Sequence, residues 1–308
     1  MSLQRLEGFP VPGAVGPSIV TIGAFDGLHR GHMALLTPLI ATARREGLLS
    51  VMVTFEPHPR CVLDPEHCPL SLTTLDEKAF LLDRLGLDRL IVIRFTAQVA
   101  QQTAATFLQH LTRGVETREL MVGYDFALGR GRHGDHAFLR DYAARHGFRL
   151  ETVTPVVRAR EPIASSRIRR LLLLGQLRAA AQLLGRDYFL RSTVEHGSQR
   201  GHMLGYPTAN LAIPEGKLLP PHGVYAARVE VDGATYPGAV YIGVRPTFQE
   251  HTVMVEAYLF DFEGDLYGRE MTVWFVQRLR GERRFATAQA LQAQMARDVD
   301  KARRVLAT

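Results

Sequence analysis

Short β-rich runs alternate with longer helical patterns across the first 184 residues, and this alternation restricts the fold more than any other feature. Strands are predicted at Ser18–Thr21, Leu49–Phe55, Leu90–Phe95 and Glu119–Val122. Helices are predicted at Met33–Glu46, Leu75–Leu85, Ala104–Leu111 and Ala137–His146, with two shorter ones around Gly175 within Ile168–Leu184. This order predicts an α/β domain whose parallel sheet is covered by helices on both faces.

The pattern changes after Gly185. Strand-like runs lie at Tyr225–Val231, Ala239–Ile242, Val253–Phe260 and Met271–Val276, with turn residues between them. This spacing predicts a small antiparallel β-barrel or sheet, and Thr287–Leu306 predicts a final amphipathic helix. We therefore expect two domains, residues 1–184 and 185–308, with a boundary set by the change of period rather than by a linker.

The composition is that of a folded protein with anionic partners. Hydrophobic residues make up 46% of the 308 and charged residues 22%, so the chain can bury a core. No apolar run reaches the roughly 18 residues of a membrane span, and Met1–Val20 shows no signal-peptide pattern. We therefore expect a cytoplasmic protein without a membrane partner. The net charge of +6 suits nucleic acid or phosphorylated small molecules.

The two cysteines, Cys61 and Cys68, are too few for a disulfide framework. Together with His58 and His67 they could form a zinc site. The short C-x-x-C spacing of such sites is missing, and prolines interrupt the segment. A loop is therefore the favoured interpretation.

The segment Gly23–His32 lies between the first predicted strand and the first predicted helix. Its glycines allow backbone N–H groups to approach a phosphate, and a helix N-terminus offers unpaired donors with a partial positive charge. His29 and His32 share that terminus, where both can donate hydrogen bonds to the charge that develops on a reacting phosphorus. A tight turn with two solvated histidines is the simpler alternative.

Four segments of this region together resemble one family. His29-x-Gly31-His32, after Gly23-x-Phe25-Asp26-Gly27, is similar to the motif of the Rossmann-like HxGH nucleotidyltransferases, and in this long form to that of the bacterial flavin adenylyltransferases. The other three resemble the family's FxPHP loop, its G-x-D-F-x-F-G loop and its ISSTxIR signature: Phe55–Pro59, Gly123–Asp135 and Ser165–Arg169. Ala164 and Leu128 depart from the family's usual serine and aromatic residue.

The resemblance implies a division of roles. It makes His29 and His32 catalytic groups, and His58, Asp125 and Phe126 members of loops that bind flavin or nucleotide. Contacts to ATP and its phosphates are implied for Gly23, Phe25, Asp26, Gly31, Ser165, Ser166 and Arg169. A match of Gly129-x-Gly131-x-x-Gly134 to the dinucleotide fingerprint is interpreted as coincidental, because bulky Arg and His fill the positions between its glycines.

A second polar cluster lies at Leu204–Asn210. The Thr208 hydroxyl and the Asn210 amide stand two residues apart on an extended segment, so both side chains point to the same side. Both are hard oxygen donors, which suit Mg²⁺ and ATP phosphates. A polar turn after Pro207 would contain the same residues, so this segment alone does not identify a function.

Residues 185–285 resemble the riboflavin kinase module, whose fold is a small antiparallel barrel. The resemblance implies that Gly205, Pro207, Thr208 and Asn210 bind Mg-ATP, with Thr208 and Asn210 as the Mg²⁺ ligands. It also makes Glu256 the general base. The residues around Glu256 show no clear apolar–polar alternation, so the sequence does not decide which face of the strand Glu256 occupies. His202, Tyr241 and Tyr258 replace an arginine, an asparagine and a histidine of the family pattern, and the lost arginine predicts weaker ATP binding at neutral pH.

Together the two resemblances imply a bifunctional enzyme of flavin cofactor synthesis. Riboflavin and ATP give FMN in one reaction, and FMN and ATP give FAD and pyrophosphate in the other, with Mg²⁺ as cofactor. The expected partners are riboflavin, FMN, FAD and ATP, without nucleic acid. The alternatives are another HxGH transferase, a tRNA-charging ligase, for which a K-M-S-K-S-like loop is missing, and an RNA-binding barrel suggested by the basic charge.

Overall fold

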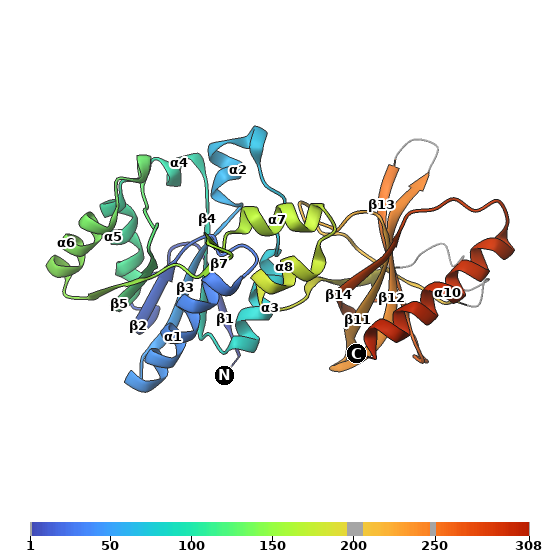
Figure 1. The fold of residues 1–308 in the computed structure, drawn as a ribbon. Helices are drawn as coiled ribbons and strands as arrows, with labels where there is room; N and C mark the ends of the chain where they lie inside the picture. The colour runs from blue at the N-terminus through green and yellow to red at the C-terminus, as the bar shows by residue number, and fades with distance from the viewer. Residues whose placement is uncertain (1, 196–205, 247–250, 308) are drawn as a thin grey trace. The chain divides into compact units, whose positions relative to one another are not determined.

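The structure is a computed structural model that describes residues 2–195, 206–246 and 251–307 (Figure 1). The chain divides into two compact units, Met1–Ser165 and Ser166–Thr308. Each unit has its own sheet, and the two are described separately. Within the described residues, every helix is too short or too polar to cross a membrane.

The first unit is built on a six-stranded parallel sheet with the order β1-β4-β3-β2-β5-β6. Its strands are β1 (Gln4–Glu7), β2 (Val15–Ile22), β3 (Leu49–Glu56), β4 (Arg89–Arg94), β5 (Val115–Gly123) and β6 (Arg149–Val153). The strand order reverses at β2, which has β3 on one side and β5 on the other. The sheet confirms the predicted α/β fold, although the two edge strands, β1 and β6, were not predicted because their residues are mostly polar and exposed.

Helices cover both faces of this sheet, because each helix buries one apolar stripe. On one face lie α1 (Arg30–Glu46) and α3 (Leu75–Leu85), whose Leu36, Leu39 and Leu82 are fully buried. On the other lie α5 (Ala104–Gly114) and α6 (His136–His146), and their apolar residues join a second core cluster. Shorter elements complete the unit: α2 (Pro59–Leu63), α4 (Ala97–Ala100), β7 (Val157–Arg158) and β8 (Glu161–Pro162).

The two cysteines of the chain form a disulfide. Cys61 lies on α2 and Cys68 follows a short turn, and their sulfur atoms are bonded. This corrects the expectation of a chain without disulfides, and it removes both sulfur ligands from the alternative zinc site with His58 and His67. Among the residues that the structure describes, no group of three or more His, Cys, Asp or Glu side chains could hold a metal ion.

The second unit is a closed antiparallel barrel with the order β10-β13-β12-β11-β14-β9. Two helices precede it, α7 (Ser165–Leu173) and α8 (Leu177–Leu184), and α10 (Ala288–Leu306) follows it. The strands are β9 (Tyr188–Glu195), β10 (Ala209–Leu211), β11 (Gly223–Val231), β12 (Ala234–Pro246), β13 (His251–Leu259) and β14 (Glu270–Gly281). The barrel and its final helix confirm the second half of the predicted fold.

Apolar residues lie on both faces of several barrel strands. Tyr225 and Val229 of β11 are fully buried, whereas Val224 and Ala226, on the opposite face, form a core cluster with Ala302 of α10. The helix therefore covers part of the outer surface of the barrel. This covering explains why these strands lack a simple apolar–polar alternation.

Candidate active sites

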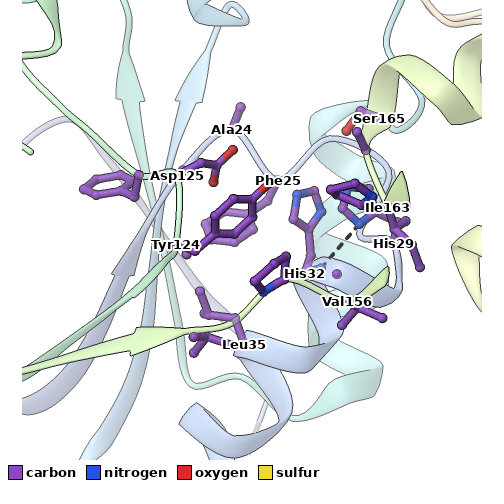
Figure 2. A pocket seen from close by; sticks show the side chains of 18 of the residues that line it. Ala24, Phe25, His29, His32, Leu35, Tyr124, Asp125, Val156, Ile163 and Ser165 are labelled. Atoms are coloured by element: carbon purple, nitrogen blue, oxygen red, sulfur yellow. Dashed lines mark hydrogen bonds between the residues drawn. The ribbon is translucent and has the colours of Figure 1, made fainter. Parts of the chain in front are cut away.

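The first candidate site lies where the strand order of the parallel sheet reverses. Ligands bind open α/β sheets at the carboxyl ends of the strands beside such a reversal. A cavity of about 350 Å³ occupies this place, between the ends of β2 and β5 (Figure 2). Its lining includes most of the residues predicted for this site: Gly23, Phe25, Asp26, His29, Gly31, His32, His58, Asp125, Phe126 and Ser165.

The two histidines are held together at the N-terminus of α1. His29 is the N-cap residue, and its Nδ1 accepts a 3.4 Å hydrogen bond from the backbone N–H of His32. The two rings are stacked with centroids 3.6 Å apart, and the Phe25 ring meets His32 edge-on at 5.2 Å (Figure 2). A Cβ atom on Gly31 would lie 3.1 Å from the His29 ring, so glycine leaves room for that ring.

The turn before the histidines is fixed by the segment that precedes α3. The buried Asp26 carboxylate accepts hydrogen bonds from the backbone N–H groups of Leu72 and Thr73, both at 3.0 Å. The Thr73 hydroxyl in turn accepts from the N–H of Gly27, also at 3.0 Å. These bonds hold a turn in which Phe25, Gly27 and Leu28 all have positive φ angles. Asp26 therefore serves the shape of the turn, and its predicted contact with phosphate stays a prediction.

A buried lysine reaches the same turn from α3. The Lys78 Nζ donates to the Ala24 carbonyl oxygen at 2.7 Å and to the Thr54 hydroxyl at 3.0 Å. Burial lowers the pKa of Lys78 to about 8, and the negative charges of Asp26 and Glu56 oppose this shift. Sequence reasoning missed both Thr73 and Lys78, because their partners lie far away along the chain.

Asp125 and Phe126 lie between two cavities. They line the first one, and they also line a neighbouring cavity of about 680 Å³ whose wall includes the rings of Phe55, Phe95 and Phe107. The large aromatic wall suits a flat heteroaromatic ring. The backbone carbonyl of Asp125 accepts a 2.7 Å hydrogen bond from Arg132.

Close packing accounts for two glycines of the apparent dinucleotide fingerprint. A Cβ atom on Gly129 would lie 2.5 Å from the backbone nitrogen of Ala104, and one on Gly134 would lie 2.5 Å from the Ala104 side chain. These glycines therefore allow the loop to approach the start of α5. This agrees with the interpretation of the match as coincidental.

The remaining predicted residues of the first site begin the next helix. The Ser165 hydroxyl donates to the Asp26 carbonyl oxygen at 2.9 Å, which ties the start of α7 to the turn. Ser166 and Arg169 follow in α7 and belong to the second compact unit.

The second candidate site lies on the barrel. A cavity of about 340 Å³ is lined by Thr208, Tyr241 and Glu256, together with apolar side chains from the strands and from α10. Glu256 pairs with Asn210 on β10 and with Tyr241 on β12, so the three residues form a row across three strands. Val255 and Ala257 are fully buried on the opposite face of β13, which places Glu256 on the cavity side.

Tyr241 lies beside two carboxylates. Its hydroxyl donates to Glu282 Oε1 at 2.7 Å, and this bond lowers the pKa of the Glu282 carboxyl. Burial and the two charges of Glu282 and Glu256 raise the pKa of the Tyr241 phenol, so the phenol remains a donor. A Cβ atom on Gly243 would overlap the Tyr241 hydroxyl, so glycine at this position lets the ring lie along the strand.

Two predicted features fall partly outside the described residues. Gly205 and His202 lie within 196–205, whereas Pro207 is exposed and stands beside Thr208. The weaker ATP binding expected from His202 therefore stays a prediction, which the KM for ATP between pH 6 and 8 can test.

Comparisons with known proteins agree on both halves of the chain. A family model for FAD synthetase matches residues 13–167, and one for riboflavin kinase matches residues 184–306. The "Bifunctional riboflavin kinase/FMN adenylyltransferase" of Pseudomonas fluorescens is 38% identical over 94% of this chain and 93% of its own length. The protein of the same name from Escherichia coli (strain K12) is 36% identical over 96% and 94%. A solved structure described as a macrolide-efflux protein from Streptococcus pneumoniae superposes with a TM-score of 0.85 at 30% identity, covering 98% of this chain and 99% of that one.

Proposed function

The chain belongs to the family of bifunctional riboflavin kinases/FMN adenylyltransferases, and from that premise we propose how its residues divide the two reactions. Riboflavin and ATP give FMN and ADP, and FMN and ATP give FAD and pyrophosphate. We assign FAD formation to residues 1–184 and FMN formation to residues 185–308. The riboflavin kinase match, which begins at residue 184, supports this boundary.

In FAD formation, a phosphate oxygen of FMN attacks the α-phosphorus of ATP and pyrophosphate leaves. His29 and His32, stacked at the N-terminus of α1, donate hydrogen bonds to the charge that develops on the transferring group. The backbone from Gly23 to Gly31 binds the phosphates together with Ser165. The contacts expected from the sequence for Ser166 and Arg169 stay predictions. The isoalloxazine ring occupies the aromatic cavity beside Asp125 and Phe126, and His58 borders the nucleotide.

In FMN formation, the ribityl hydroxyl of riboflavin attacks the γ-phosphorus of ATP and ADP leaves. An alcohol is a weak nucleophile, so the Glu256 carboxylate accepts its proton as the new P–O bond forms. Thr208 lines the same cavity, and Asn210 stands directly opposite Glu256 on the neighbouring strand. The cavity also has apolar side chains in its lining, which suit the flavin ring: Val224, Val240, Leu291, Met295 and Val299.

Thr208 and Asn210 would hold Mg²⁺ in the second unit, and Pro207 would contact the ATP, as the sequence also predicts for Gly205. The donor set fits the ion, because a hydroxyl and an amide oxygen are hard ligands and an anionic phosphate can supply the rest. When bound, Mg²⁺ neutralises charge on the ATP phosphates. We also propose a cytoplasmic location, since both reactions consume ATP.

The observation that carries the proposal is that His29 and His32 line a cavity of the first unit, whereas Thr208 and Glu256 line a cavity of the second. Two variants test the division. His32→Ala should abolish FAD formation from FMN while riboflavin phosphorylation continues. Glu256→Ala should stop FMN formation while the protein still converts supplied FMN to FAD. Products are separated by chromatography after incubation with riboflavin or FMN, ATP and Mg²⁺.

The reverse pattern, or loss of both activities in one variant whose fold is intact, would contradict the assignment. If wild-type protein made FMN but no FAD, the adenylyltransferase role of the first unit would be refuted and the kinase role of the second would stand. Circular dichroism of each variant controls for unfolding.

A further inference from the structure

Lysine is rare in this chain. Only three of the 37 Lys and Arg residues are lysines: Lys78, Lys217 and Lys301. Lys78 and Lys217 are 4% and 5% exposed, and Lys301 donates to the Leu279 carbonyl oxygen at 2.9 Å. Lys78 and Lys217 are thus buried, whereas Lys301 is exposed.

The Lys78 ammonium joins the ends of two strands. Its partner Ala24 belongs to the turn after β2, and its partner Thr54 lies near the end of β3. The Thr54 hydroxyl also donates to the Ala24 carbonyl oxygen at 3.2 Å, so the three groups form a closed triangle. An ammonium is compact and can point its donors at converging acceptors, whereas a guanidinium is planar and larger.

The turn that Lys78 holds leads directly to the catalytic histidines. Ala24 lines both the cavity that contains His29 and His32 and the neighbouring cavity with the aromatic wall. It stands next to Phe25, whose ring packs edge-on against His32. The carboxylates of Asp26, in the same turn, and Glu56, at the end of β3, lie close enough to act on the lysine charge. Phe25 therefore links Ala24 to the His32 ring.

We propose that Lys78 is a positioning residue for adenylyl transfer, which ties the turn before α1 to the end of β3 and so sets the place of the two histidines. The inference rests on the roles proposed for His29 and His32. Misplacing a catalytic group by about 1 Å can cost about 100-fold in rate. Loss of the ammonium should therefore lower kcat more than it weakens substrate binding.

The test compares Lys78→Met, Thr54→Val and the double variant. For FAD formation from FMN and ATP, Lys78→Met should lower kcat by about 10- to 100-fold, with the KM for FMN changed by less than about threefold. Thr54→Val removes one partner without a large change of volume and should lower kcat less. The double variant should lose less than the product of the two single effects, because both remove the same contact.

Three controls make the outcome specific. Riboflavin phosphorylation by the same variants should be unchanged, since Lys78 lies in the other unit. Lys217→Met, at the other lysine that is at least nine-tenths buried, should leave FAD formation unchanged. Binding of FMN, followed by quenching of its fluorescence, should persist in Lys78→Met.

Two results would overturn the inference: a kcat within twofold of wild type, or a loss that appears only as weaker FMN binding. If Lys78→Met fails to fold, Thr54→Val decides, and a wild-type kcat in that variant is contrary to the inference. His32→Ala is measured alongside. If His32→Ala retains FAD formation, the proposed roles of the histidines are wrong. If His32→Ala loses FAD formation but Lys78→Met has wild-type activity, only the inference about Lys78 is wrong.

Discussion

Tyr241 stands where the family pattern has an asparagine, and its ring and its hydroxyl have separable functions. The ring forms part of the cavity wall beside Glu256, whereas the hydroxyl is bonded to Glu282. Tyr241→Asn should raise the KM for riboflavin by about tenfold, since a lost apolar contact of this size is worth about 1.4 kcal/mol. Tyr241→Phe keeps the ring and should leave the KM nearly unchanged.

Steady-state kinetics of riboflavin phosphorylation distinguishes the two variants, with FAD formation from FMN as the internal control. Equal KM values for wild type and Tyr241→Asn would show that the ring does not contact the flavin.

The buried Lys78 makes stability depend on pH in a defined direction. Its pKa is about 8 in the folded protein, below its ordinary value of 10.5. Between these values the folded state holds the amine neutral while the unfolded state binds a proton, so the free energy of unfolding rises with pH. Below pH 8 both states are charged and this contribution is constant.

Denaturant unfolding of wild type and Lys78→Met from pH 7 to 10 measures this effect, because other groups cancel in the difference. The stability of wild type relative to the variant should rise by up to about 1.4 kcal/mol per pH unit above pH 8. If the difference in unfolding free energy between wild type and Lys78→Met stayed constant from pH 7 to 10, the pKa of Lys78 would not be lowered in the folded protein.

At the scale of elements, the start of α3 serves two purposes through neighbouring threonines. Thr74 caps the helix in a capping box with Glu77, whereas the Thr73 hydroxyl accepts a hydrogen bond from the N–H of Gly27, in the turn before α1. Each side chain satisfies one backbone N–H group. Removing either hydroxyl therefore costs stability, but only one of them touches the turn.

Thr73→Val and Thr74→Ala form a matched pair. Each should lower the free energy of unfolding by about 1 kcal/mol. Thr73→Val should also slow FAD formation, whereas Thr74→Ala should leave that rate unchanged. Thermal unfolding and FAD assays on both variants test this, and equal rates in the two would assign Thr73 a purely structural role.

The same elements show what the sequence could predict. The central strands and long helices carry continuous or periodic apolar residues, so local patterns predicted them. The polar edge strands β1 and β6 have no such pattern. The contacts of Lys78 and Thr73 join residues that only the completed sheet brings together, and no local motif encodes them. Glu256 was ambiguous because α10 covers the outer face of the barrel and both faces of β13 are partly apolar.

At the scale of the whole molecule, the cavity that we propose for each reaction is lined by residues of one unit only. The two units should therefore complement each other between chains. A mixture of His32→Ala and Glu256→Ala should convert riboflavin to FAD, with a lag while FMN accumulates in solution. Chromatography of timed samples follows this, with each variant alone as the control. A mixture that makes FMN but no FAD, although Glu256→Ala converts supplied FMN, would show that FMN is not exchanged between chains.

The scarcity of lysine also gives the protein its own set of spectroscopic probes. Protein grown on isotopically labelled lysine contains one labelled side chain in the first unit, Lys78, and two in the second, Lys217 and Lys301. A spectrum with so few signals needs little assignment, and single substitutions complete it. Binding of FMN or ATP at the turn can then be followed at Lys78 in the intact chain, while Lys217 and Lys301 report on the barrel in the same sample.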